Sequence, residues 1–146
     1  MARHLIVAHQ TAASRELIER VRELTGRDPD AEFVLLVPAT PTSHLLTWEE
    51  GEARQRAARR AREASEALRR EAGAKVVAAK VGSHSPLDAV GDELRASPGY
   101  ASIVLSTFPP GISRWLQIGL PRQLRVRYRL PVEHVVAAPA QATTNH

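Results

Sequence analysis

The stretch of sequence that decides the fold begins Ala101-Ser-Ile-Val-Leu-Ser-Thr-Phe-Pro-Pro-Gly111 and continues Ile112-Ser-Arg-Trp-Leu-Gln-Ile-Gly-Leu-Pro-Arg-Gln-Leu124. After a short connection it ends in Leu130-Pro-Val-Glu-His-Val-Val136. This pattern predicts a buried strand, a Pro/Gly loop in the position of a phosphate-binding loop, an Arg-rich helix and a final strand. The loop lacks most of the glycines that bring backbone amides close to a phosphate, so the sequence predicts the fold more directly than the activity.

The composition is that of one globular domain. The chain has 146 residues, of which 43% are hydrophobic and 25% charged, and its mean hydropathy is -0.26. The longest apolar runs, such as Phe33–Val37, have the length of a strand and fall short of the roughly 20 residues of a membrane span. We expect a single domain over residues 1–138, a disordered tail over residues 139–146 and no membrane partner.

Cysteine content and charge narrow the functional classes. The chain has no cysteine, which excludes disulfides and thiolate chemistry, and a cytoplasmic location is expected. The net charge is +4, but most arginines alternate with acidic residues, as on solvated helix faces. Only one basic segment has no acid nearby, and it lacks interleaved aromatic side chains. We therefore expect no nucleic-acid partner, with binding through that segment as the alternative: Arg122, Arg125, Arg127 and Arg129.

Apolar runs of strand length alternate with helical patterns along the whole chain. This alternation is typical of βαβ units around a parallel sheet. The fold class that we predict is a three-layer α/β/α sandwich with a five-stranded parallel sheet in the order 3-2-1-4-5, which is Rossmann-like. The expected strands are Leu5–Ala8, Phe33–Val37, Val76–Val81, Ile103–Leu105 and Val132–Val136.

Two of the connecting helices carry clear local signals. A long helix is expected from about Trp48 to Ala72, and its inward stripe is small, which lets the helix lie close to the sheet. In a later helix Ser85 is the expected N-cap, followed by Pro86 at the first helical position, and the expected buried face is Leu87, Val90 and Leu94. The small stripe consists of Ala53, Ala57, Ala61, Ala64 and Leu68.

In an open parallel sheet of this order, ligands bind beyond the carboxyl ends of the first and fourth strands. The segments that meet there are His9-Gln10-Thr11 and Ser106 to Gly111, with Gly82-Ser-His84 and the loop from Pro38 to Thr47 along the rim. Residues Ser106 to Arg114 also have a purely structural explanation, as a strand-ending turn and a helix cap. The candidate ligand-binding residues are His9, Gln10, Thr11, Val37, Gly82, Ser106, Thr107, Gly111, Ser113, Arg114 and Gly119.

Four phrases in these regions resemble the universal stress protein family. Val7-Ala-His-Gln-Thr11 lies where that family has a strand ending in Asp-Gly-Ser, and Val81-Gly-Ser-His-Ser-Pro86 is similar to its Gly-Asp-Pro turn. Gly111-Ile-Ser-Arg-Trp-Leu116 resembles the phrase Gly-Leu-Ser-Arg-Leu-Leu, and Leu130–Val136 resembles the closing strand. The resemblance implies an adenine nucleotide alpha hydrolase-like domain with a role in stress response, ATP binding in some members, and a homodimer formed through the fifth strand.

The departures from the family pattern concern the nucleotide. Members that bind ATP carry G-x-x-G-x9-G-[S/T], but here neither early glycine is present, and Leu120 replaces the hydroxyl residue after Gly119. Each of Pro109 and Pro110 removes an amide donor, and Gln10 stands where the family has Asp. We therefore expect no cofactor and a regulatory or interaction module that does not bind ATP in the family's usual way. The alternative is an ATP- or AMP-binding switch, or a weak ATP hydrolase, that uses the crevice.

Evidence for other chemistry is thin. His9, His44 and His84 each follow a different strand, and three imidazoles would suit zinc, but their spacing matches no metal motif, so we expect polar loop histidines and no metal. His4 and His134 are expected on strand surfaces. The sequence contains no nucleophile elbow, no Walker loop and no paired carboxylates on one helix face with a nearby base, and we expect no enzymatic activity. Glu133 and His134 make the fifth strand more polar than the resemblance implies for a dimer edge; a homodimer remains the expectation, together with an unidentified protein partner.

Overall fold

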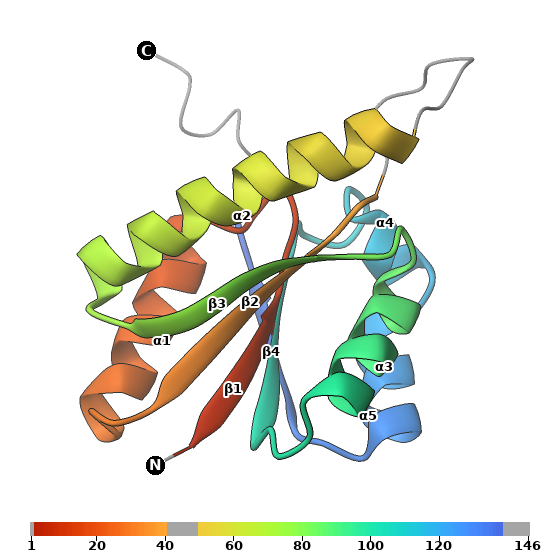
Figure 1. Ribbon diagram of the computed structural model, residues 1–146. Helices are drawn as coiled ribbons and strands as arrows, with labels where there is room; N and C mark the ends of the chain where they lie inside the picture. Colours follow the sequence, from red (N-terminus) through yellow and green to blue (C-terminus); the bar gives the residue numbers. More distant parts are fainter. Residues whose placement is uncertain (1, 41–49, 139–146) are drawn as a thin grey trace.

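The computed structural model describes residues 2–40 and 50–138. In these ranges five parallel strands form one sheet in the order β3-β2-β1-β4-β5, which confirms the predicted order (Figure 1). The strands are β1 (Arg3–Val7), β2 (Glu32–Pro38), β3 (Lys75–Gly82), β4 (Ser102–Thr107) and β5 (Val132–Val136).

Helices cover both faces of the sheet, as the three-layer prediction requires. Figure 1 shows α1 and α2 on one face and α3, α4 and α5 on the other. No helix in the described ranges has both the length and the apolar character that crossing a membrane requires. The helices are α1 (Arg15–Arg27), α2 (Glu50–Ala72), α3 (Pro86–Ala96), α4 (Arg114–Gln117) and α5 (Leu120–Tyr128).

The central strand β1 contributes side chains to two separate hydrophobic cores, one on each face of the sheet. Ile6 is fully buried on the α1/α2 side, whereas its neighbour Leu5 is fully buried on the α3/α5 side. Such alternation follows from the two-residue period of a strand, and a strand covered on both faces is apolar at every position. In the register of the sheet, Ile6 lies beside Leu35 of β2 and Val104 of β4. This packing holds the carboxyl ends of β1 and β4 side by side.

The alanine stripe of α2 is buried as predicted. Ala57 and Leu68 are fully buried, and Ala53, Ala61 and Ala64 are exposed by 3% or less. Because these side chains are short, the helix backbone lies close to the sheet and the long arginine side chains of α2 start close to it as well. The expected start of this helix at Trp48 lies outside the described residues.

The start of α3 matches its predicted signals, but its buried face differs. The Ser85 hydroxyl accepts a hydrogen bond from the Asp88 amide at 3.4 Å. Ala89, Val90 and Glu93 are buried, while the apolar residues expected on that face, Leu87 and Leu94, are only partly buried. Nζ of Lys80, on β3, donates to Oε2 of Glu93 at 3.0 Å. This contact turns Glu93 toward the sheet, so the buried face of the helix is rotated.

The Arg-rich segment forms two helices where one was expected. Gly119 has φ +69° and separates α4 from α5, which then starts with Leu120 and Pro121. A left-handed residue ends a helix readily when it is glycine, and proline suits the first turn of the next helix. The arginines of the basic segment, Arg122, Arg125, Arg127 and Arg129, are all exposed.

Candidate functional site

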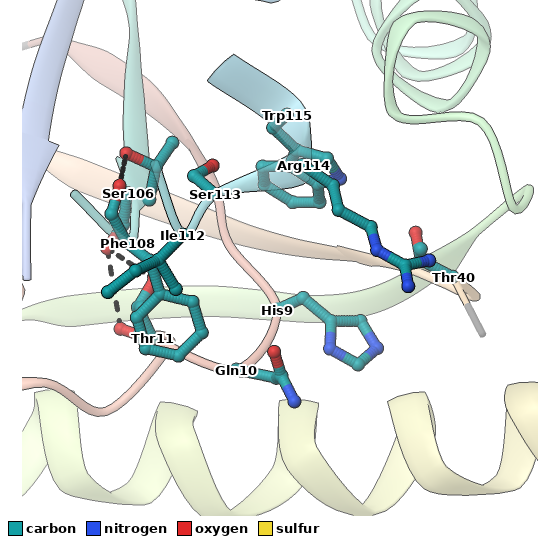
Figure 2. A pocket seen from close by; sticks show the side chains of 11 residues that line it. His9, Gln10, Thr11, Thr40, Ser106, Phe108, Ile112, Ser113, Arg114 and Trp115 are labelled. Atoms are coloured by element: carbon teal, nitrogen blue, oxygen red, sulfur yellow. Dashed lines mark hydrogen bonds between the residues drawn. The ribbon is translucent and has the colours of Figure 1, made fainter. Parts of the chain in front are cut away.

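A cavity of about 260 Å³ opens at the carboxyl ends of β1 and β4, where the strand order reverses (Figure 2). This is the place at which open α/β sheets hold their ligands. Its wall contains hydroxyl, imidazole, amide and guanidinium groups on one part and apolar side chains on another. The lining residues are His9, Gln10, Thr11, Thr40, Ser106, Thr107, Phe108, Ile112, Ser113, Arg114 and Trp115.

Two buried hydroxyl groups at the centre of this site bind each other. The side-chain oxygens of Thr11 and Ser106 lie 2.7 Å apart, and the exposed fraction of each residue is 5% or less. Thr11 lies in the turn after β1, where the amides of Ala12 and Ser14 donate to the carbonyls of His9 and Thr11. Because the turn is closed by these bonds, the Thr11 hydroxyl is held against the end of β4.

Thr107 is likewise satisfied within the chain. Its hydroxyl donates to the carbonyl of Phe108 at 2.8 Å and lies 2.7 Å from Nε2 of His134 on β5. Burial and the nearby charge of Arg125 lower the pKa of His134, so this imidazole is neutral near pH 7. His134 was expected on a strand surface, but it is partly buried and bridges β5 to the end of β4.

The loop after β4 is a closed turn. The amides of Ile112 and Ser113 both donate to the carbonyl of Pro109, at 3.1 and 3.0 Å. The amide of Leu116 donates to the Ser113 hydroxyl at 3.2 Å, which makes Ser113 the N-cap of α4. Gly111 adopts φ +90° at the tip of the turn. Two of the amides that a glycine-rich loop would turn toward a phosphate, those of Ile112 and Ser113, are thus already paired within this turn.

His9 is the most perturbed titratable group in the site. Its exposed fraction is 6%, and its Nε2 atom has no hydrogen-bond partner within the described part of the chain. Burial, with the nearby charges of Arg60 and Arg56, lowers the pKa of His9 to about 4. The imidazole is therefore uncharged at neutral pH.

Seven of the eleven residues predicted from the sequence line this cavity, and four do not. Val37 is fully buried in the core, and Gly82 packs against α3, where an added Cβ would lie 2.6 Å from that of Ala89. Gly111 and Gly119 serve the backbone turns before α4 and α5. The residues brought together are His9, Gln10, Thr11, Ser106, Thr107, Ser113 and Arg114.

Four lining residues were not selected from the sequence. Thr40 follows β2 within the predicted rim loop, and its hydroxyl donates to the carbonyl of His84 at 3.0 Å. The other three, Phe108, Ile112 and Trp115, form the apolar wall, and Trp115 also packs against the α3/α5 core. An apolar residue next to a predicted ligand loop was the available signal, since pockets are lined mostly by such side chains.

The metal interpretation receives no support from the described residues. In residues 2–40 and 50–138 no three side chains of His, Asp or Glu are close enough together to hold an ion. His44, one of the three candidate ligands, lies outside these ranges. His9 follows β1 and His84 follows β3, and neither belongs to a group of three metal-binding side chains within the described ranges.

A second and larger cavity of about 570 Å³ adjoins the first. It lies between the start of α1, the underside of α2 and the residues after β5, and it shares Gln10, Thr11 and Phe108 with the first cavity. The remaining lining residues combine both signs of charge with small apolar side chains: Ala13, Ser14, Arg15, Glu16, Arg60, Glu63, Ala64, Ala137 and Ala138.

A scan against protein-family models finds no match for this chain, and a search of curated proteins finds no similar one. Solved structures do match. A protein of the universal stress protein family from Burkholderia pseudomallei has a TM-score of 0.63 at 13% identity, with 93% of this chain and 96% of that chain covered.

Two further matches contain a nucleotide. The universal stress protein of Archaeoglobus fulgidus in complex with dAMP has a TM-score of 0.56 at 14% identity, covering 92% of this chain and 97% of its own. A universal stress protein family protein of Arabidopsis thaliana with AMP bound has a TM-score of 0.55 at 14% identity, covering 98% and 95%. The fold of this chain is therefore that of the universal stress proteins, as the resemblance in its sequence implied.

Proposed function

We propose that this protein is a regulatory or interaction module of universal stress type, without catalysis of its own, that does not bind ATP through the loop after β4. The proposal rests on the carbonyl of Pro109, which accepts hydrogen bonds from the backbone amides of both Ile112 and Ser113. A phosphate in this loop would have to replace those bonds. Each is worth about 0.5–1.5 kcal/mol, and each proline of the loop has no amide to offer in return.

The position of the prolines explains why the loop is closed. Counting back from Gly119, the pattern G-x-x-G-x9-G-[S/T] places Ser106 and Pro109 at its two early glycines and Leu120 at its hydroxyl residue. Ser106 is bound to Thr11, and Leu120 is fully buried in the α3/α5 core. Ser106, Pro109 and Leu120 therefore each take part in contacts within the chain that a bound phosphate would have to replace.

Calorimetry with ATP tests the proposal on two matched variants. Pro109→Gly restores a motif glycine and its amide, whereas Pro110→Gly adds the same freedom one position outside the motif. We expect no ATP binding by the natural chain or by Pro110→Gly, and measurable binding by Pro109→Gly. Micromolar binding of ATP by the natural chain, abolished by Arg114→Ala, would show that the loop binds the nucleotide and would overturn the proposal.

A second candidate function is binding of a nucleoside monophosphate in the crevice. It is favoured by the nucleotides in the structural matches, dAMP in one and AMP in the other, and by the size of the cavity. At about 260 Å³ the cavity lies just below the range of about 300–1,000 Å³ typical of small-ligand pockets, so it favours a compact ligand over a triphosphate. Titration with AMP alongside ATP separates the two: binding of AMP alone supports this candidate.

A homodimer through β5 belongs to the same proposal. β5 is an edge strand, and its polar side chains are held within the chain, since Glu133 forms an ion pair with Arg20 and His134 contacts Thr107. Val136, with 41% of its surface exposed, is left as an apolar contact. Light scattering should give twice the chain mass of 16.0 kDa, and Val136→Lys should give the monomer. A monomer mass for the natural chain at tens of micromolar would contradict the dimer.

The remaining parts of the proposal concern extent and location. All five strands between Arg3 and Val136 share one sheet, which supports a single domain over residues 1–138. The expected tail over residues 139–146 lies outside the described residues. A cytoplasmic location is proposed on the absence of cysteine, and fractionation of cells that produce the protein would test it.

A further inference from the structure

Three buried side-chain nitrogen atoms on the α2 side of the crevice lack hydrogen-bond partners. Nε2 of His9, Nε of Arg56 and Nε of Arg60 are each buried, and none finds a hydrogen-bond partner among the residues described. Arg56 and Arg60 are four positions apart on α2 and therefore lie on one face of the helix. Arg60 lines the larger cavity and so lies on the side of the crevice toward which the His9 imidazole points, with Arg56 one helical turn before it (Figure 2).

The cluster lies where the two cavities adjoin. His9 lines the smaller cavity, Arg60 lines the larger one, and Gln10 and Thr11 line both. In Figure 2 the His9 imidazole points away from the Thr11–Ser106 hydroxyl pair and toward α2. A group held by the cluster would thus sit on the opposite side of the crevice from the loop after β4.

The charges that line the larger cavity are balanced, with Arg15 and Arg60 against Glu16 and Glu63, and Arg56 adds one further positive charge on the same helix. Burial lowers the pKa of Arg60, and the charge of Glu63 offsets part of that effect. A buried charged donor without a partner is destabilising, so the two guanidinium groups gain stability from an acceptor, and His9 adds a third donor when its Nε2 atom carries a hydrogen. The planar guanidinium groups match the oxygens of a phosphoryl group, which can accept from several donors at once.

We propose that His9, Arg56 and Arg60 form a side-chain site for a phosphoryl group. Anion recognition in this chain is then carried by α2 and the turn after β1, and the amides of the loop after β4 take no part in it. The inference rests on the proposed function to the extent that the loop is closed, and it names the chemical class of ligand, a small phosphate ester or inorganic phosphate. An ester would place its remaining atoms against the apolar wall of Phe108, Ile112 and Trp115.

The test uses two double variants with the same change of charge. Arg56→Gln/Arg60→Gln removes the cluster, and Arg54→Gln/Arg59→Gln removes two exposed arginines of the same helix. Inorganic phosphate and AMP are titrated into each protein, with adenosine as the uncharged control. We expect affinity for phosphate and AMP to fall at least tenfold in the first variant and to stay within twofold of the natural chain in the second.

A second measurement uses the natural chain alone, so it does not depend on whether the variants fold. In the natural chain, addition of phosphate should shift the NMR signals of the His9 imidazole and raise its pKa, because a nearby anion favours the charged ring. The inference is wrong if neither phosphate nor AMP moves those signals, or if both double variants weaken binding equally, as a general effect of net charge would. Failure of the proposed function is distinct, since it appears as ATP binding that depends on Arg114 and not on Arg56 and Arg60.

Discussion

The side-chain oxygens of Thr11 and Ser106 lie 2.7 Å apart at the floor of the crevice, although the two residues are 95 positions apart in the chain. The contact joins the turn after β1 to the end of β4, at the point where the strand order reverses. One of the two hydroxyls donates to the other, and the Ser106 hydroxyl also lies 3.4 Å from the carbonyl of Thr11, so few of their hydrogens remain for a ligand. The pair therefore joins the turn after β1 to β4 and makes the floor of the crevice a poor donor for a phosphate.

Removing both members of the pair should destabilise the fold by less than the sum of the two single removals. Ser106→Ala leaves the buried Thr11 hydroxyl without its partner, at a cost of about 1–3 kcal/mol, whereas after Thr11→Ala the Ser106 hydroxyl keeps the backbone carbonyl of residue 11 at 3.4 Å, so its cost should lie at the lower end. The double variant removes both groups, so its loss should be smaller than the sum of the single losses. Urea unfolding of the four proteins measures the coupling, and strictly additive losses would show that the contact contributes nothing.

The free energy of unfolding should decrease as the pH is lowered, because His9 is held in its neutral form in the folded chain. The pKa of His9 is lowered from 6.5 to about 4, so between these values the unfolded chain binds a proton that the folded chain does not. The contribution is fully present above pH 6.5 and is lost as the pH falls toward 4, by roughly 3 kcal/mol from this group.

Comparison with His9→Gln isolates this effect, because the lowered pKa values of His4 and His134 act in the same direction in both proteins. Urea unfolding at pH 7 and pH 4.5 should give a smaller loss of stability on acidification for the variant. Equal losses in the two proteins would show that His9 is not held in the neutral form.

A buried acidic network at the other face of the sheet should be sensitive to its central carboxylate. Glu93 accepts from Lys80 at 3.0 Å and from the hydroxyl of Tyr100 at 2.6 Å, and its own exposed fraction is 6%. Burial first, and then the bond and charge of Glu93, raise the pKa of Tyr100.

Glu93→Ala removes the partner of two groups and should cost about 2–3 kcal/mol, a value reduced by the partial exposure of Lys80. Tyr100→Phe keeps the Lys80–Glu93 pair and should cost about 1 kcal/mol. Chemical unfolding ranks the two variants, and a larger loss for Tyr100→Phe would contradict the assignment of Glu93 as the centre of the network.

The end of α5 offers a stabilising substitution. Arg129 has φ +56°, the single positive φ outside glycine in the described residues, and it caps the helix through its amide to the carbonyl of Arg125 at 3.1 Å. Glycine adopts this conformation without strain, so Arg129→Gly should raise the free energy of unfolding by about 0.5–1 kcal/mol.

The matched control is Arg127→Gly, which removes the same charge from a helical position and should lower stability by about 1 kcal/mol. Thermal unfolding of the two variants should therefore move the midpoint in opposite directions. A lower midpoint for Arg129→Gly would show that the arginine side chain makes a contact worth more than the strain.

Local patterns predicted the elements and their order well. The alternation of apolar runs with helical periods indicated a covered parallel sheet, and the alanine stripe of α2 is buried as its spacing required. The cap at Ser85 needs only neighbouring residues, so it was equally visible. In the Arg-rich segment the pattern was wrong, because Gly119 divides it through a backbone conformation that no side-chain periodicity records.

The candidate site was predictable in position and not in its bonds. Strand order places His9, Thr11 and Ser106 at one edge, and all three line the cavity. Whether Thr11 offers its hydroxyl to a ligand or to Ser106 depends on a distance across 95 positions of chain. The same holds for the arginines of α2, whose pattern alone is typical of a solvated face.

The sequence by itself determined the class of fold, because burial of apolar residues at period two or near four is a local property that the chain states directly. Only the tertiary structure decided which polar groups at the crevice are already paired and which are not. Ile112 and Ser113 donate to Pro109, whereas Nε2 of His9 has no hydrogen-bond partner among the described residues. Hydrogen bonds form over about 3 Å, so their pairing follows from the packing of distant segments and cannot be read along the chain.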